Sequence, residues 1–123
     1  IISAENNKVT PDQLRATPMK AIMKSLPVNL NSEKAIDTIQ TVSFSFSDSK
    51  EIFTIKIRKG VAELSFLPTE NNDLKIKSDQ QTLKETLAGL RNIASISLSL
   101  ANDTIQVEGG NIEFLKFLGL FTD

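Results

Sequence analysis

The 123-residue chain contains no histidine, cysteine, tryptophan or tyrosine. Without histidine and cysteine it cannot build a Ser–His–Asp or Cys–His catalytic group, a disulfide framework, or the usual zinc and non-haem iron sites. We therefore predict no catalytic residue and no metal site in this chain.

An excess of charge of one sign is also lacking, because 14 Lys and Arg residues are balanced by 15 Asp and Glu residues, for a net charge of −1. A nucleic acid or an anionic membrane would be recognised through a basic patch, and the sequence has no such run. Apolar stretches are short as well, far below the roughly 18 residues that a transmembrane helix needs. We expect neither a nucleic-acid partner nor a transmembrane segment.

The chain does have an ordinary globular composition, 40% hydrophobic and 24% charged, and a length suited to one domain with a single core. Residues 1–9 are polar and unpatterned, and we interpret them as a linker or disordered leader before a domain at residues 10–123. The first residue is isoleucine and not methionine, which favours a module cut from a longer protein.

Two short helices are predicted first. Residues 10–13 (TPDQ) have the threonine, proline and glutamine of a capping box that starts a helix. Thr17-Pro18 has the pattern of a second helix start, and Pro27 is expected to end that helix. The apolar residues between them recur at helical spacing: Met19, Ile22, Met23 and Leu26.

Strands are predicted next, as an antiparallel meander. Apolar residues alternate with serine, threonine or lysine over residues 42–46, 53–57 and 62–66, with turn residues between them. Residues 74–77 repeat the alternation as a fourth strand. One apolar face and one polar face are typical of a sheet covered on one side only.

A helix should follow through Leu90, with Ser78 or Asp79 as its N-cap and Gln81 completing a capping box with Ser78. Residues 91–102 are ambiguous. Isoleucine and leucine alternate there with serine, so propensity favours a strand that would form a hairpin with the strand after it.

The last twenty residues, TIQVEGGNIEFLKFLGLFTD, predict a strand, a glycine turn and a helix over residues 112–121 with Asn111 as its N-cap. One apolar stripe of this helix consists of Phe114, Phe117, Leu118 and Phe121. Further apolar groups lie off that stripe: Ile112, Leu115 and Leu120. Such a helix is either buried on nearly all sides or forms one wall of a groove that a ligand or partner fills.

In chain order these elements predict an α+β domain with a mostly antiparallel sheet of about five strands and helices packed on one face. The pattern resembles the sterol-carrier-protein-2-like (SCP2-like) fold. The segments that carry the resemblance are LKIKSDQQTLKETLAGL, at residues 74–90, and TIQVEGGNIEFLKFLGLF, at residues 104–121. In that family a strand leads into a helix that ends near a glycine, here Gly89, and a later strand ends in a V-x-G turn, here residues 107–109.

The front half is similar to the C-terminal domain of the metallo-β-lactamase-type alkyl sulfatases. The matching segments are TPMKAIMKSLPVNLNSEKA, at residues 17–35, and FSFSDSKEIFTIKIRKGVAEL, at residues 44–64. The resemblance covers about residues 14–121. It departs from the family at residues 91–102, where the family tends to have a short helical segment, and the chain contains no residue of a zinc-binding catalytic domain.

The resemblance implies a non-catalytic domain of a bacterial alkyl sulfatase, which is a hydrolase of sulfuric esters. In that family the chemistry belongs to a separate zinc-dependent metallo-β-lactamase domain, and the C-terminal domain offers an apolar groove for the alkyl chain of the substrate. Zinc is accordingly expected only in the catalytic domain. The implied partners are an aliphatic or lipid-like small molecule, the catalytic and dimerisation domains of the same parent chain and, as one alternative, a second copy in a homodimer. The parent enzyme is expected to be soluble, with the periplasm and secretion as alternative locations.

The residues expected to line the groove come from the sheet and from the helices that cover it: Phe44, Phe46, Phe53, Leu83, Leu87, Phe114, Phe117, Leu118 and Phe121. Plain packing in the core is the competing interpretation for each of them. Two other functions stay open, namely a structural module whose last helix packs on another domain or subunit, and a free-standing lipid or sterol carrier. An independent enzyme is the least favoured, since its candidate carboxylates are scattered along the chain: Asp48, Glu51, Asp79, Glu108 and Glu113.

Overall fold

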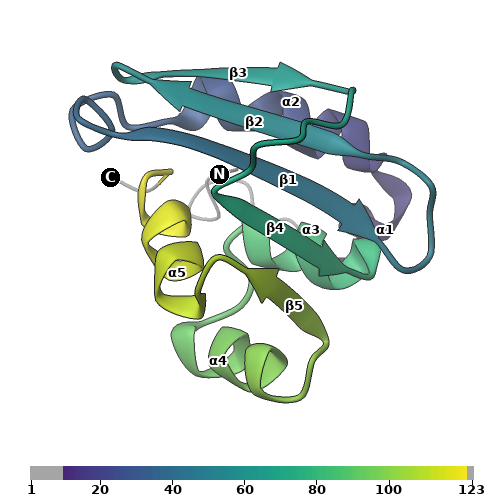
Figure 1. Cartoon of the computed structure of the whole chain (residues 1–123). Helices are drawn as coiled ribbons and strands as arrows, with labels where there is room; N and C mark the ends of the chain where they lie inside the picture. Colours follow the sequence, from purple (N-terminus) through teal and green to yellow (C-terminus); the bar gives the residue numbers. More distant parts are fainter. Residues whose placement is uncertain (1–9, 122–123) are drawn as a thin grey trace.

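The computed structural model describes residues 10–121, which form a five-stranded sheet and five α-helices (Figure 1). The expected leader at residues 1–9 lies outside the described residues. In chain order the elements are α1 (Pro11–Ala16), α2 (Met19–Asn29), β1 (Ile39–Phe46), β2 (Phe53–Arg58), β3 (Val61–Ser65), β4 (Leu74–Ser78), α3 (Gln80–Leu87), α4 (Ile93–Ala101), β5 (Ile105–Glu108) and α5 (Asn111–Gly119). Within residues 10–121, none of these helices has the length and apolar character required to cross a lipid bilayer.

The sheet has the order β3-β2-β1-β4-β5, and its neighbouring strands are antiparallel except for β1 and β4, which are parallel. The predicted meander of β1, β2 and β3 is confirmed. The segment after β3 then crosses β2 and β1 and reaches β4 on the other side of β1 (Figure 1). This crossing explains why one pair in a mostly antiparallel sheet is parallel.

The sheet is covered on one face, as its alternation predicts. Phe44 of β1 lies opposite Phe53 of β2 and Ile76 of β4, and all three side chains are buried. The strand residues that alternate with these buried ones, such as Lys56 and Lys77, are exposed. Helix α5 packs on the apolar face, where the Phe117 ring lies 5.9 Å from the Phe44 ring.

Helices α1 and α2 differ from prediction at the boundary between them. The Thr10 capping box of α1 is confirmed, since the Gln13 side chain accepts from the Thr10 amide at 2.9 Å and the Gln13 amide donates to the Thr10 hydroxyl. Thr17, however, caps the C-terminus of α1 through its amide and does not start α2. Helix α2 also continues past Pro27 to Asn29, because a proline in the last turn removes only one backbone hydrogen bond.

The caps of α3 and α5 are shifted by one residue. Asp79, and not Ser78, caps α3 by accepting from the Thr82 amide at 2.9 Å, so the predicted box with Gln81 is wrong. Helix α3 ends at Leu87 and not at Leu90, because Gly89 adopts a φ of +78°. Helix α5 begins at Asn111, which the sequence predicted as its N-cap, and ends at Gly119.

The largest correction concerns residues 91–102, where α4 replaces the strand that propensity favoured. The Asn92 side chain caps this helix by accepting from the Ser95 amide at 2.8 Å. Alternation of apolar residues and serine also places Ile96 and Leu100 four residues apart, on one face of a helix, and both are buried. The pattern therefore fits either structure, and packing beside β5 decides for the helix.

Candidate functional site

All nine predicted groove residues lie in the core between the sheet and the helices, and none is more than 8% exposed: Phe44, Phe46, Phe53, Leu83, Leu87, Phe114, Phe117, Leu118 and Phe121. Their rings contact one another, as Phe117 and Phe121 do at 5.1 Å between centroids. Leu118 also borders a surface cleft. That the nine together line a ligand groove stays a prediction.

This cleft lies between the C-terminal end of α3, helix α4 and helix α5, and we call it the α3–α5 cleft. Its volume is about 280 Å³, close to the roughly 300 Å³ at which ligand pockets begin. Its lining is mostly apolar: Thr86, Gly89, Arg91, Ile93, Ile96, Leu115, Leu118 and Gly119.

Helix α5 serves both the core and the cleft, because it has two apolar faces. Phe114 and Phe117 are buried in the core beneath the sheet. Leu115 and Gly119, four residues apart and therefore on one helix face, line the cleft. A Cβ atom at Gly119 would have no neighbouring atom within 4 Å. The glycine thus leaves open a space that a larger side chain would fill.

Helix α4 supplies the opposite wall. Ile96 is buried, whereas Ile93, three residues earlier, is 66% exposed at the rim. The capping interaction of Asn92 fixes the first turn of α4 and so places Ile93. An exposed isoleucine beside an apolar cleft is a surface that a hydrocarbon could cover.

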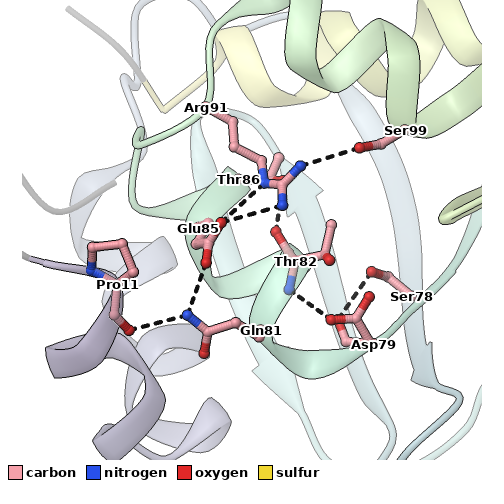
Figure 2. Close-up of polar contacts among 9 residues, drawn as sticks. All are labelled: Pro11, Ser78, Asp79, Gln81, Thr82, Glu85, Thr86, Arg91 and Ser99. Carbon is pink, nitrogen blue, oxygen red and sulfur yellow. Dashed lines mark hydrogen bonds and ion pairs between the residues drawn. The ribbon is translucent and has the colours of Figure 1, made fainter.

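A compensated ion pair borders the cleft (Figure 2). The Arg91 guanidinium lies 3.2 Å from the Glu85 carboxylate through Nη2, and its Nε donates to the same Oε1 atom. Its Nη1 donates to the hydroxyl of Ser99 on α4 at 3.2 Å. The two charged side chains are 26% and 19% exposed, for Arg91 and Glu85 respectively. The cleft therefore has an apolar wall and a rim whose charge is already neutralised.

The ion pair belongs to a longer polar network that includes two of the three helices around the cleft, α3 and α4. The side-chain amide of Gln81 donates both to the second Glu85 carboxylate oxygen, at 2.9 Å, and to the Pro11 carbonyl of α1, at 3.0 Å (Figure 2). This network connects α1, α3 and α4. The side of the cleft formed by α3 and α4 is consequently held in place by hydrogen bonds, which lowers the entropic cost of binding there.

The scattered carboxylates do not converge on a catalytic site. Asp48 accepts from the Gln80 amide at 3.1 Å, Asp79 caps α3, and Glu113 pairs with Lys116 at 3.6 Å. Among residues 10–121, no group of three or more such side chains could hold a metal ion. These acids have local structural roles.

The sequence identified only part of the cleft. Leu115 was singled out as an apolar residue off the main stripe, and Leu118 was among the predicted groove residues. Ile93, Ile96 and Arg91 were missed, because their segment was interpreted as a strand. Gly119 had a readable signal, since it is a small residue four positions after Leu115 in an otherwise apolar helix.

Residues 7–123 match the family model described as alkyl sulfatase C-terminal. A linear primary-alkylsulfatase from Pseudomonas sp. is 26% identical over 113 residues, which are 92% of this chain and 21% of that enzyme. The solved structure of the stereoselective inverting sec-alkylsulfatase from Pseudomonas sp. matches with a TM-score of 0.80 and 20% identity, over 97% of this chain and 18% of that one. Sterol carrier protein 2 from Yarrowia lipolytica matches with a TM-score of 0.61 and 12% identity, over 84% of this chain and 85% of that one.

These comparisons confirm the predicted SCP2-like fold and the resemblance to the alkyl sulfatases. The chain spans about a fifth of the length of the alkylsulfatases that it matches. Because the family model covers nearly all of its residues, the chain belongs to the alkyl sulfatase C-terminal family.

Proposed function

We propose that this domain binds the aliphatic chain of an alkyl sulfate in the α3–α5 cleft and presents the ester to a separate catalytic domain of the same parent chain. The observation that carries the proposal is the apolar cleft that Gly119 leaves open between α4 and α5. Among the described residues of its lining the only charged one, Arg91, is neutralised by Glu85. Such a site favours a hydrocarbon chain and leaves the sulfate outside.

The energetics suit a recruiting role. Each methylene moved from water into an apolar site contributes about 0.8 kcal/mol, or about a fourfold increase in affinity. The cleft of about 280 Å³ can hold part of a surfactant chain. A substrate held by its chain keeps its head group free for a catalytic site elsewhere.

Zinc chemistry is assigned to the other domain. Histidine and cysteine, the common zinc ligands, do not occur in this chain. The carboxylates of residues 10–121 do not offer a substitute set. We therefore propose that hydrolysis is carried out by a zinc-dependent metallo-β-lactamase domain of the parent enzyme, which this domain supplies with substrate.

The test is a titration of the 123-residue chain with 1-hexanol, 1-octanol and 1-decanol, by calorimetry and by amide NMR shifts. We expect saturable binding that strengthens about fourfold per methylene, with shifts at Ile93, Leu115 and Gly119. Linear, unsaturated shifts, or shifts confined to the polar face of the sheet, would contradict the proposal. Far-ultraviolet circular dichroism verifies that the fold persists throughout.

A second candidate function is an interaction module. Ile93 at the rim of the cleft is 66% exposed and Ile112 on α5 is 69% exposed, so both could be covered by another domain or a second subunit. Sedimentation equilibrium distinguishes self-association through a second subunit from ligand binding by a monomer. A dimer that dissociates when Ile93 is replaced by serine, together with no binding of any alcohol, would favour the interface.

A further inference from the structure

A second depression lies near the β3 edge of the sheet, whereas the α3–α5 cleft lies near β5. It has a volume of about 320 Å³ and is formed by α2 and by the segments before β2 and after β3. We call it the Lys20–Phe66 pocket. Its lining combines two lysines and one glutamate with apolar groups: Lys20, Lys50, Glu51, Ile52, Phe53, Phe66 and Pro68.

Phe66 forms the apolar wall of this pocket and is held in place although it is 46% exposed. The fully buried Thr54 donates its hydroxyl to the Leu67 carbonyl at 3.0 Å, and the Leu67 amide donates to the Ser65 hydroxyl at 3.2 Å. The Phe66 ring also packs edge-on against Phe53, with 5.7 Å between centroids. Its exposed face is therefore a preorganised contact surface.

Two ammonium groups complete the pocket. Lys20 Nζ lies 4.7 Å from the centroid of the Phe66 ring, a cation–π contact. Neither Lys20 nor Lys50 belongs to any of the ion pairs formed within residues 10–121. Among the described residues of the lining, Glu51 is the one acid and it keeps its negative charge. Two lysines against one glutamate leave the pocket with a positive balance beside an aromatic ring.

We propose that the Lys20–Phe66 pocket binds a single-chain anionic amphiphile, namely an alkyl sulfate. The anion lies between the ammonium groups of Lys20 and Lys50, and the first part of the chain covers Phe66 and Pro68. The inference takes its ligand class from the proposed function but concerns a separate site. It would give the domain a contact for the head group that the α3–α5 cleft does not provide.

The two sites differ in what they recognise, because Arg91 in the cleft is paired with Glu85 whereas Lys20 and Lys50 have no such partner among the described residues. A neutral alcohol should therefore bind only in the cleft. An alkyl sulfate should bind in both sites. The stoichiometry of octyl sulfate against 1-octanol separates the two proposals.

The experiment titrates the 123-residue chain with octyl sulfate and with 1-octanol below the micelle concentration, by calorimetry and amide NMR shifts. The test variant is the double substitution Lys20→Gln and Lys50→Gln. The control is Lys24→Gln, which removes one positive charge from an exposed position of α2, the helix that carries Lys20. We expect two octyl sulfates on the wild type and the control, one on the double variant, and one 1-octanol on all three. Each lysine alone should account for about a fivefold change in affinity at the second site.

Three results would overturn the inference: one octyl sulfate per wild-type chain that also binds one 1-octanol, equal losses of octyl sulfate affinity in the control and the double variant, or no octyl sulfate shifts at Lys20 and Phe66. Binding to phosphatidylglycerol vesicles without binding of monomeric octyl sulfate would also overturn it, in favour of a membrane contact. Failure of the proposed function has a different result. In that case 1-octanol would not bind, while octyl sulfate would still shift the amides of this pocket.

Discussion

Replacing Gly119 by leucine should close the α3–α5 cleft while the core remains intact. Gly119 is the last residue of α5, and a Cβ atom there would have no neighbour within 4 Å. A leucine side chain would occupy the space of about four ligand methylenes, so about 3 kcal/mol of binding free energy, or more than a hundredfold in affinity, should be lost. Because glycine is a poor helix former, the free energy of unfolding should stay equal or rise by up to about 1 kcal/mol.

The assay is a calorimetric titration with 1-octanol, paired with thermal unfolding followed by circular dichroism. Gly119→Ala is the matched control, since its single methyl group should weaken binding only about fourfold. Binding at wild-type affinity in a stably folded Gly119→Leu variant would refute the assignment of the ligand to this cleft. A large fall in the unfolding temperature would instead refute the statement that the space beside Gly119 is open.

Three further changes test the packing, each by urea unfolding. Gly109→Ala should destabilise the fold more than Gly110→Ala. Both glycines have a φ near +110°, so either alanine would carry a strain of about 1–3 kcal/mol, but only the Gly109 Cβ would also lie 2.2 Å from a backbone oxygen. Equal losses of stability would contradict this. Phe117→Ala should cost about 3–5 kcal/mol, whereas Ile112→Ala should change stability by less than about 0.5 kcal/mol; similar values would mean that Phe117 is not in the core. Arg91→Met should lower the free energy of unfolding by about 1–3 kcal/mol, since it leaves the partly buried Glu85 carboxylate without its partner. An unchanged urea midpoint would show that the ion pair does not stabilise the fold.

The strands and the coverage of the sheet could be predicted because they depend on local alternation. In β1, Phe44 and Phe46 are buried while Ser43 and Ser45 point to the other face, as a period of two requires. The pairing of β4 with β1 was not predictable in the same way. The parallel contact between β1 and β4 depends on a chain crossing that local patterns do not specify.

The candidate site was predictable only where it depends on α5. The excess of apolar residues in that helix was visible in the sequence, and Leu115 and Leu118 do line the cleft. The pattern could not tell which apolar face the sheet would cover. Phe114 and Phe117 face the core, so the smaller Leu115 and Gly119 are left for the cleft.

By itself the sequence determined the class of domain, the one-sided sheet and the absence of histidine and cysteine chemistry, because these follow from composition and from local periodicity. It also determined the glycine turn before α5, since Gly109 and Gly110 adopt positive φ values that other residues rarely reach. Only the tertiary structure decided that residues 93–101 form a helix and that Arg91 meets Glu85 and Ser99 beside a cleft. The physical reason is that an alternating pattern satisfies both a strand and a helix, and the choice between them depends on which distant surface is available for burial.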